Sequence, residues 1–188
     1  MYNILYLNDY INYYNKKENK LIKFLPYSKT LEKGLIIDIK KFTKSFKKVL
    51  KDNNIKQGLF NDKIIIITPP NFNNAYKYLY KEIFTNLNYN IVVFKSEISF
   101  YNLSKKNISI NINKDYFYIT KTIFNKTESE CYNIKDLELL LTDKTKNYYL
   151  YGLYKKEIID LFEKHKINYY IFEGNENFFI KKQNSDLR

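Results

Sequence analysis

Several residue types that build active sites are scarce in this sequence of 188 residues. Cys131 and His165 are the only cysteine and the only histidine, so the chain by itself forms no disulfide, thiolate metal site or multi-histidine centre. There is no tryptophan, and glycine occurs only four times and proline three times. These shortages exclude most catalytic triads and zinc sites.

Long apolar runs are also missing. The first residues, MYNILYLNDYINYY, contain neither a basic leader nor an unbroken apolar stretch. No segment reaches the roughly 18 apolar residues that a membrane-spanning helix requires. We therefore expect a cytoplasmic protein with no membrane partner.

What the sequence does have is positive charge. Lysine and arginine number 32 against 20 aspartate and glutamate, a formal charge of +12. Every one of these cations except Arg188 is a lysine, and isoleucine, asparagine and tyrosine are abundant, as expected of an A+T-rich genome. Two interpretations stay open: a lysine-coated surface that reflects codon bias, and a surface that binds a polyanion. Tyr13, Tyr14, Lys16 and Lys17 are the only hint of an aromatic and basic strip for single-stranded bases.

Hydrophobic periodicity predicts a similar order of elements in each half of the chain. The first half reads as strands at 2–8, 11–15 and 20–25, a helix from Leu35 that ends near Asn53 and Asn54, a strand at 64–67, a helix at 76–87 and a strand at 91–94. The second half reads as strands at 108–112, 117–120 and 129–134, a short helix at 136–141, a strand at 148–151, a helix at 155–166 and a strand at 169–172.

A β-meander followed by alternating helices and strands, occurring twice, is the plan of the actin-like (ribonuclease H-like) superfamily. We therefore predict an α/β fold with two small lobes, each a mixed sheet with flanking helices. The predicted N-terminal lobe is 1–105 and the C-terminal lobe is 106–188.

Two turns would have to hold phosphate if the chain bound a nucleotide. Backbone amides approach phosphate closely only where no Cβ obstructs them, which favours glycine. The turns at 7–10 and 113–116 contain no glycine, and Gly152 stands alone where nucleotide-binding relatives have paired glycines. A strand-end glycine at a turn is the favoured interpretation of Gly152. We therefore expect no nucleotide, no other cofactor and no catalytic residues.

A nuclease of the ribonuclease H-like kind is a less favoured alternative. Such an enzyme holds two divalent ions with several carboxylates at strand ends. Asp9, Glu97 and Asp115 lie near the ends of predicted strands. Acidic residues at these places are commonly turn formers or helix caps, so we predict no metal site.

Several segments resemble the TsaB family, whose members are non-catalytic partners in tRNA threonylcarbamoyladenosine synthesis. The family's Gly-Pro-Gly-Ser-Phe-Thr-Gly turn is similar to residues 68–74 here, which keep Pro69 and Phe72 but no glycine. Residues 110–118 resemble the family's Ile-Asp-Ala-Arg stretch, and 178–182 resemble its Pro-Leu-Tyr-Leu-Arg ending. The resemblance spans nearly the whole chain in an eroded form.

Actin-like proteins of cell division, cell shape and pilus assembly are the rival family. Their patterns resemble residues 34–38, Gly-Leu-Ile-Ile-Asp, and residues 96–98, Ser-Glu-Ile. A degenerate adaptor from that lineage is therefore the alternative function.

The resemblance to TsaB implies a scaffold that pairs with a TsaD-like catalytic subunit. The resemblance is also compatible with a TsaE-like ATPase as a further partner, and it implies that tRNA is bound through the complex. Because the family pairs through helices of its first lobe, it places the contact at or beside Phe42, Phe46, Val49, Leu79 and Ile83. The altered turn at Pro69, Pro70 and Phe72 would be the remnant of the family's glycine-rich turn.

Overall fold

The structure, a computed structural model, describes residues 2–56, 62–152, 156–172 and 178–185. The chain forms two compact units. Unit 1 consists of Met1–Glu97 together with Phe179–Arg188, and unit 2 is Ile98–Phe178. The predicted boundary at 105/106 differs from this division by eight residues, and the end of the chain belongs to unit 1 rather than to unit 2.

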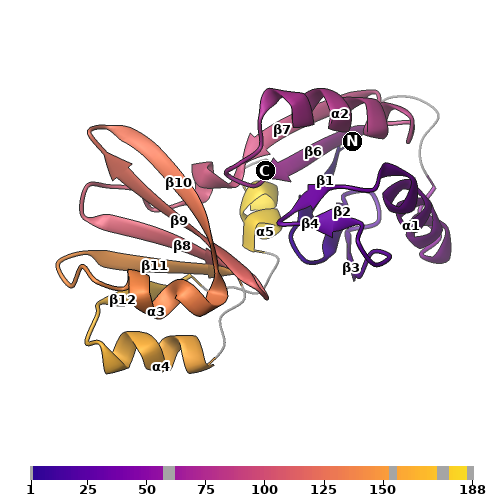
Figure 1. Cartoon of the computed structure of the whole chain (residues 1–188). Coiled ribbons are helices and arrows are strands. Elements are labelled where there is room, and N and C mark those ends of the chain that lie inside the picture. The colour runs from indigo at the N-terminus through magenta and orange to yellow at the C-terminus, as the bar shows by residue number, and fades with distance from the viewer. Residues whose placement is uncertain (1, 57–61, 153–155, 173–177, 186–188) are drawn as a thin grey trace. The chain divides into compact units, whose positions relative to one another are not determined.

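Unit 1 is built on a mixed sheet of five strands in the order β3-β2-β1-β6-β7 (Figure 1). Its strands are β1 (Tyr2–Leu7), β2 (Ile11–Asn15), β3 (Lys20–Phe24), β6 (Lys63–Thr68) and β7 (Ile91–Ser96). The first three form an antiparallel meander, whereas β6 pairs in parallel with both β1 and β7. The β-branched run of β6 is buried because the strand is central.

Unit 2 repeats this sheet strand for strand, in the order β10-β9-β8-β11-β12. Its strands are β8 (Asn107–Ile112), β9 (Tyr116–Ile123), β10 (Lys126–Asn133), β11 (Asn147–Gly152) and β12 (Tyr169–Ile171). Again the meander is antiparallel and β11 pairs in parallel with both of its neighbours. The repeated order predicted from the sequence is confirmed.

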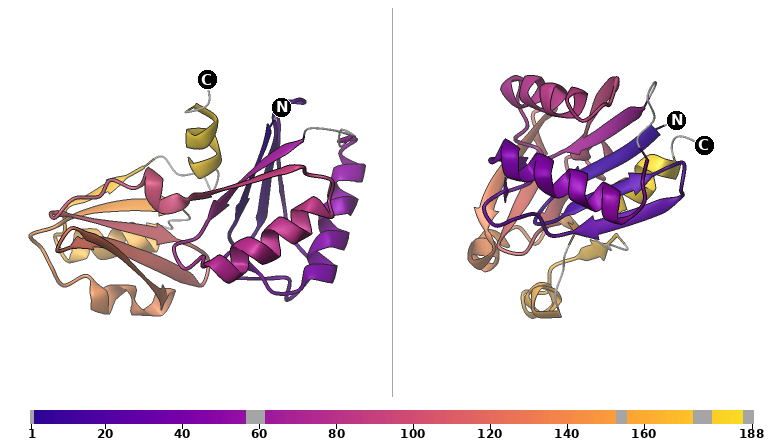
Figure 2. Two further views of the ribbon diagram at one scale, coloured as in Figure 1. Left: turned by 90° about the horizontal axis from the view of Figure 1, so that it is seen from above. Right: turned by 90° about the vertical axis from the view of Figure 1, so that its right-hand side faces the viewer.

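Two helices cover one face of the unit 1 sheet (Figure 2). They are α1 (Ile39–Asp52) and α2 (Asn74–Thr85). The Asp38 side chain caps α1 by accepting a hydrogen bond from the Lys41 N–H, and the Asn73 side chain caps α2 by accepting one from the Tyr76 N–H. Beneath the helices lies a core rich in aromatic residues.

A third helix, α5 (Phe178–Ser185), lies against the other face of this sheet. The ring of Phe179 is 4.9 Å from that of Tyr6, whose side chain points away from the α1 and α2 face because neighbouring strand residues alternate. Asn184 accepts a hydrogen bond from the Tyr2 hydroxyl at 2.9 Å. These contacts tie the last described residues to unit 1, and they explain why the chain end belongs there.

Unit 2 has less helical cover. A 3₁₀ turn (Ile134–Asp136) leads into the four-residue α3 (Leu137–Leu140), and α4 (Lys156–Lys164) crosses between β11 and β12. Leu137, Ile158 and Phe162 anchor these helices in a second core against the sheet.

The elements depart from the prediction in four places. Leu35, expected in the first helix, lies in a two-strand ribbon of β4 (Leu31–Glu32) and β5 (Leu35–Ile36). The β9–β10 hairpin extends beyond the predicted strands to a turn at Phe124 and Asn125. The prediction stopped short because residues 121–130 lack apolar alternation. A 3₁₀ helix (Glu97–Phe100) and α5 were not predicted.

Among the described residues, no helix is long and apolar enough to cross a membrane.

Candidate functional site at the strand ends

The turn between β1 and β2 is held together by its own hydrogen bonds. The Asn8 N–H donates to the Tyr10 carbonyl at 3.1 Å, and the Tyr10 N–H donates to Asn8 Oδ1 at 2.9 Å. Asn8 Oδ1 also accepts from Asn12 Nδ2 at 3.1 Å. Both amides are therefore occupied within the turn, and the buried Asn8 side chain fills the space beside them.

A lysine covers the outer side of the same turn. Lys23 Nζ lies 3.8 Å from the centroid of the Tyr10 ring, within the range of a cation–π interaction. Burial lowers the pKa of Lys23. The cation is thus engaged with the protein's own aromatic ring.

Gly34 and Pro69 meet the end of β1 next to this turn. Lys33 and Gly34 have φ values of 49° and 79°, the pattern of a tight hairpin turn between β4 and β5. A Cβ on Gly34 would lie 2.7 Å from the Leu7 carbonyl oxygen and 3.6 Å from Pro69 Cγ. The structure therefore brings together three segments that the sequence analysis singled out: the glycine-free turn, the 34–38 pattern and the altered family turn.

The altered turn after β6 is anchored by Phe72. Its N–H donates to the Pro69 carbonyl at 3.2 Å, and its ring lies 4.9 Å from Tyr80 and 5.5 Å from Phe94. A hollow of about 360 Å³ opens at the carboxyl ends of β6 and β7. Its lining includes Thr68, Pro70, Lys77 and Ser96. The retained proline and phenylalanine thus shape the backbone beside the hollow.

The corresponding turn of unit 2 is closed in a similar way. Asn113 N–H donates to the Tyr116 carbonyl at 2.9 Å. Gly152 has a φ of 86°, and a Cβ there would lie 2.2 Å from the Ile112 carbonyl oxygen and 2.6 Å from Asn111 Oδ1. Gly152 is required because β11 and β8 approach each other so closely at their ends. A structural role accounts for it in full.

The acidic residues considered for a nuclease lie in a 3₁₀ helix and in two hairpin turns. Among the described residues, no group of three or more histidine, cysteine, aspartate or glutamate side chains lies close enough to hold a metal ion. Glu97 is buried in the 3₁₀ helix that follows β7. Asp9 and Asp115 lie in the two hairpin turns, at Leu7–Ile11 and Ile112–Phe117.

The residues placed at or beside the partner contact face inward. Phe42 and Phe46 are fully buried, with their rings stacked at 5.6 Å, and Ile83 is also buried. Val49 and Leu79 are half-buried against the same core. These side chains hold α1 and α2 onto the sheet. Partner binding by the outer faces of the helices stays a prediction.

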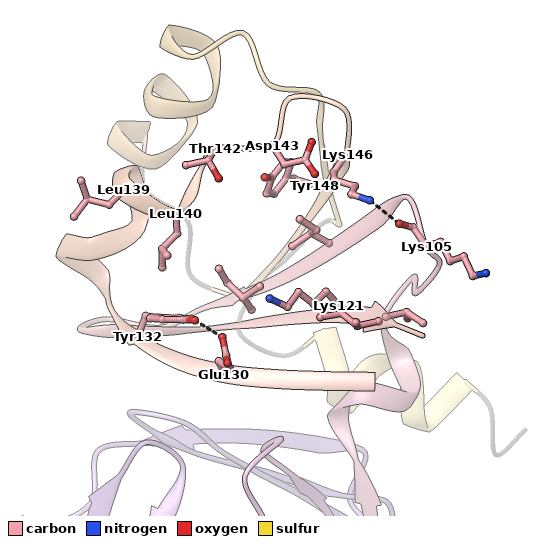
Figure 3. A pocket seen from close by; sticks show the side chains of 14 residues that line it. Lys105, Lys121, Glu130, Tyr132, Leu139, Leu140, Thr142, Asp143, Lys146 and Tyr148 are labelled. Atoms are coloured by element: carbon pink, nitrogen blue, oxygen red, sulfur yellow. Dashed lines mark hydrogen bonds between the residues drawn. The ribbon is translucent and has the colours of Figure 1, made fainter. Parts of the chain in front are cut away.

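Unit 2 contains a hollow that the sequence analysis missed (Figure 3). It measures about 350 Å³ and lies beside α3, over the strands β8 to β11. Its polar groups contact one another: Lys146 Nζ donates to the Lys105 carbonyl at 2.9 Å, and Tyr132 donates to Glu130. Hydrogen bonds from Thr145 lower the pKa of Asp143 at the rim. The hollow lies beside α3 because that helix has only four residues and covers little of the sheet. The short helix predicted at 136–141 was the one sign of this hollow in the sequence.

No protein-family model matches the chain, and no curated protein matches its sequence. Solved structures do resemble it. MreB5 of Spiroplasma citri bound to AMPPNP has a TM-score of 0.59 at 10% identity, over 99% of this chain and 97% of that chain. The alignment with MreB5 bound to ADP has a TM-score of 0.49 at 14% identity, over 71% of this chain and 52% of that chain.

Two further structures resemble the chain over most of its length. A Bacteroides thetaiotaomicron protein with an actin-like ATPase fold and unknown function has a TM-score of 0.59 at 13% identity, over 96% of this chain and 93% of that chain. AlfA from a Bacillus subtilis plasmid, solved as a filament, has a TM-score of 0.50 at 11% identity, over 94% of this chain and 93% of that chain. Together with the duplicated sheets, these likenesses show that the chain has the actin-like ATPase fold.

Proposed function

We propose that this chain is a non-catalytic adaptor on an actin-like fold, which acts by holding a protein partner. The observation that carries this proposal is the turn between β1 and β2. Its Asn8 and Tyr10 amides bond within the turn, so they are not presented to a phosphate group. MreB5 was solved with AMPPNP, and the fold alone does not bring that ligand to this chain.

One candidate partner is an actin-like assembly of cell division, cell shape or pilus formation. The likeness to MreB5 and to the AlfA filament supports this candidate at the level of the fold. The 34–38 pattern supports it as well, because Gly34 forms the tight turn and Asp38 caps α1.

The second candidate partner is a TsaD-like enzyme, with tRNA and a TsaE-like ATPase in the same complex. It rests on the sequence resemblance to TsaB. The retained Pro69 and Phe72 support it, because both have defined places beside the end of β1 and in the aromatic core. Neither partner follows from the fold, so the two candidates are separated by experiment.

The test is complex formation with purified proteins, followed by size-exclusion chromatography with light scattering. The chain is mixed with the TsaD-like protein or with the actin-like filament protein of the same organism. A stoichiometric complex with either supports the adaptor and identifies its partner. ATP hydrolysis, or Mg²⁺-dependent nucleic-acid cleavage, by the chain alone would contradict the proposal.

A surface variant tests whether the outer face of α2 forms the contact. A charge at Phe46 would disrupt the core, so we choose Tyr78, which is 78% exposed on α2. Tyr78→Asp is expected to weaken the complex at least tenfold by placing a charge at the contact. Phe124→Asp is the matched control, because Phe124 is an exposed aromatic residue in unit 2. If both variants bind as the wild type does, the contact lies elsewhere than on α2.

A further inference from the structure

The positive charge of this protein is concentrated in one unit. Unit 1 contains 20 lysine and arginine residues against 9 aspartate and glutamate, a net charge of +11. Unit 2 contains 12 against 11, a net charge of +1. Codon bias toward lysine acts along the whole gene, so it does not by itself leave one unit nearly neutral. The difference indicates that unit 1 carries a basic surface of its own.

Helix α1 presents the densest part of that surface. Its exposed residues are Ile39, Asp52 and six lysines: Lys40, Lys41, Lys44, Lys47, Lys48 and Lys51. We call these six the lysine stripe. Steps of three and four residues place them on one side of the helix over roughly 16 Å. Lys41 pairs with Asp38 at 3.2 Å, and within the described part of the chain no ion pair involves the other five.

The stripe has a rigid backing. The opposite side of α1 is fixed in the core by Phe42 and Phe46, whose rings also contact Phe84 of α2. Like charges at i,i+4, as in Lys44 and Lys48, repel each other, and a bound polyanion relieves that repulsion. The packed side of α1 therefore fixes the backbone positions from which the lysines extend.

Neighbouring residues extend the basic surface. Lys77 and Lys81 are exposed on α2, which lies beside α1 on the same face of the sheet (Figure 2). At the other end, Lys47, Lys51 and Lys56 surround a hollow of about 370 Å³ that follows α1. The surface is thus broader than one helix.

The composition of the stripe favours the phosphate backbone of a duplex. The exposed residues of α1 include no aromatic side chain to stack on unpaired bases, and no arginine, asparagine or glutamine to read base edges; a single exposed aromatic residue, Tyr78, lies on the neighbouring α2. Lysine ammonium groups bind phosphates as point charges without reading sequence. We propose that the lysine stripe of α1 binds the phosphate backbone of double-stranded nucleic acid.

A membrane surface fits the stripe less well. Helices that lie on membranes bury a free apolar face in the lipid, and stable attachment takes a second signal besides charge. The apolar face of α1 is already used, since Phe42 and Phe46 are fully buried and Leu50 is nearly so. The proposal does not rest on which protein partner the adaptor holds.

The test is fluorescence anisotropy of the full chain with a labelled DNA duplex of mixed sequence and an RNA duplex of the same sequence. Both are expected to bind, because the lysines contact phosphates that the two share. The variant with Lys44→Gln, Lys48→Gln and Lys51→Gln is expected to bind at least tenfold more weakly. Its slope of log affinity against log salt should fall by about 2 to 3, close to one for each lysine that no longer neutralises a phosphate.

The matched control removes the same charge from unit 2, with Lys106→Gln, Lys135→Gln and Lys144→Gln, all exposed in the wild type. It is expected to change affinity less than about twofold. Lysine-to-arginine changes at 44, 48 and 51 keep the charge and should bind as the wild type does. Circular dichroism checks that each variant keeps its helices.

Four results would overturn the proposal. They are no duplex binding at low salt, equal weakening in the two glutamine variants, failure of the arginine variant to bind, and preferential binding of phosphatidylserine vesicles through α1 with no competition from duplex.

Discussion

At the scale of single residues, asparagine and lysine take places that glycine commonly fills. Asn54 and Asn88 adopt φ values of 57° and 64° just after α1 and α2, and Lys166 adopts 54° after α4. In each case the next residue's N–H bonds to a carbonyl five residues earlier and closes the helix. A scarcity of glycine is therefore compatible with helix ends. The scarcity of glycine matters at a turn that binds phosphate, because there the ligand needs the space that a side chain would occupy.

Asn8 provides the residue-scale prediction. Asn8→Ala removes the acceptor for the Tyr10 N–H and for Asn12 Nδ2. Since an unsatisfied buried donor costs about 1 to 3 kcal/mol, the free energy of unfolding should fall by about that amount in urea titrations. Asn8→Asp keeps the acceptor oxygen and should lose less. A wild-type urea midpoint for Asn8→Ala would show that the side chain does not hold the turn.

The sequence predicted the position of this turn and its lack of glycine, but not its closure. Besides the local bonds between Asn8 and Tyr10, Asn12 donates to Asn8 from across the hairpin, with its side chain on the same face. That placement follows from the strand register, which is settled only when the strands pair. Phe46 was placed at or beside a partner contact, but its side chain is buried in the core, as the helical spacing of the apolar residues in α1 allows.

At the scale of elements, long periodic segments were predicted well and short ones were missed. The boundaries of α2 and the central strand β6 agree with the sequence pattern to within a few residues. The ribbon of β4 and β5 was missed because two-residue strands show no periodicity. Helix α5 was missed because it is short and, among its residues with described exposure, three are buried: Phe179, Ile180 and Gln183.

Helix α5 provides the element-scale prediction. Phe179 is 1% exposed and packs on Tyr6, so Phe179→Ala should lower the free energy of unfolding of unit 1 by about 3 to 5 kcal/mol. Lys181→Ala, at an exposed position of the same helix, should change it by less than about 0.5 kcal/mol. Thermal unfolding followed by circular dichroism measures both. Equal melting temperatures for the two variants would mean that α5 does not hold the sheet.

At the scale of the whole molecule, the duplicated plan was predictable because each half repeats the same order of strands and helices. The end of the chain does not follow this plan. The last described residues join unit 1 through contacts such as Tyr2 with Asn184, which are far apart in the sequence. Local patterns carry no information about such contacts. The hollow in unit 2 follows from a difference between the repeats, since α3 has four residues where α1 has 14.

The central claim is that the chain has an actin-like fold in which the turns at 7–10 and 113–116 are closed by their own hydrogen bonds and do not bind the phosphates of a nucleotide. Isothermal titration calorimetry of the full chain with Mg²⁺ and ATP tests it most directly, with MreB5 of Spiroplasma citri, solved with AMPPNP, as the positive control. We predict no binding heat above dilution for this chain at millimolar ATP. Saturable binding with a Kd in the micromolar range would contradict the account.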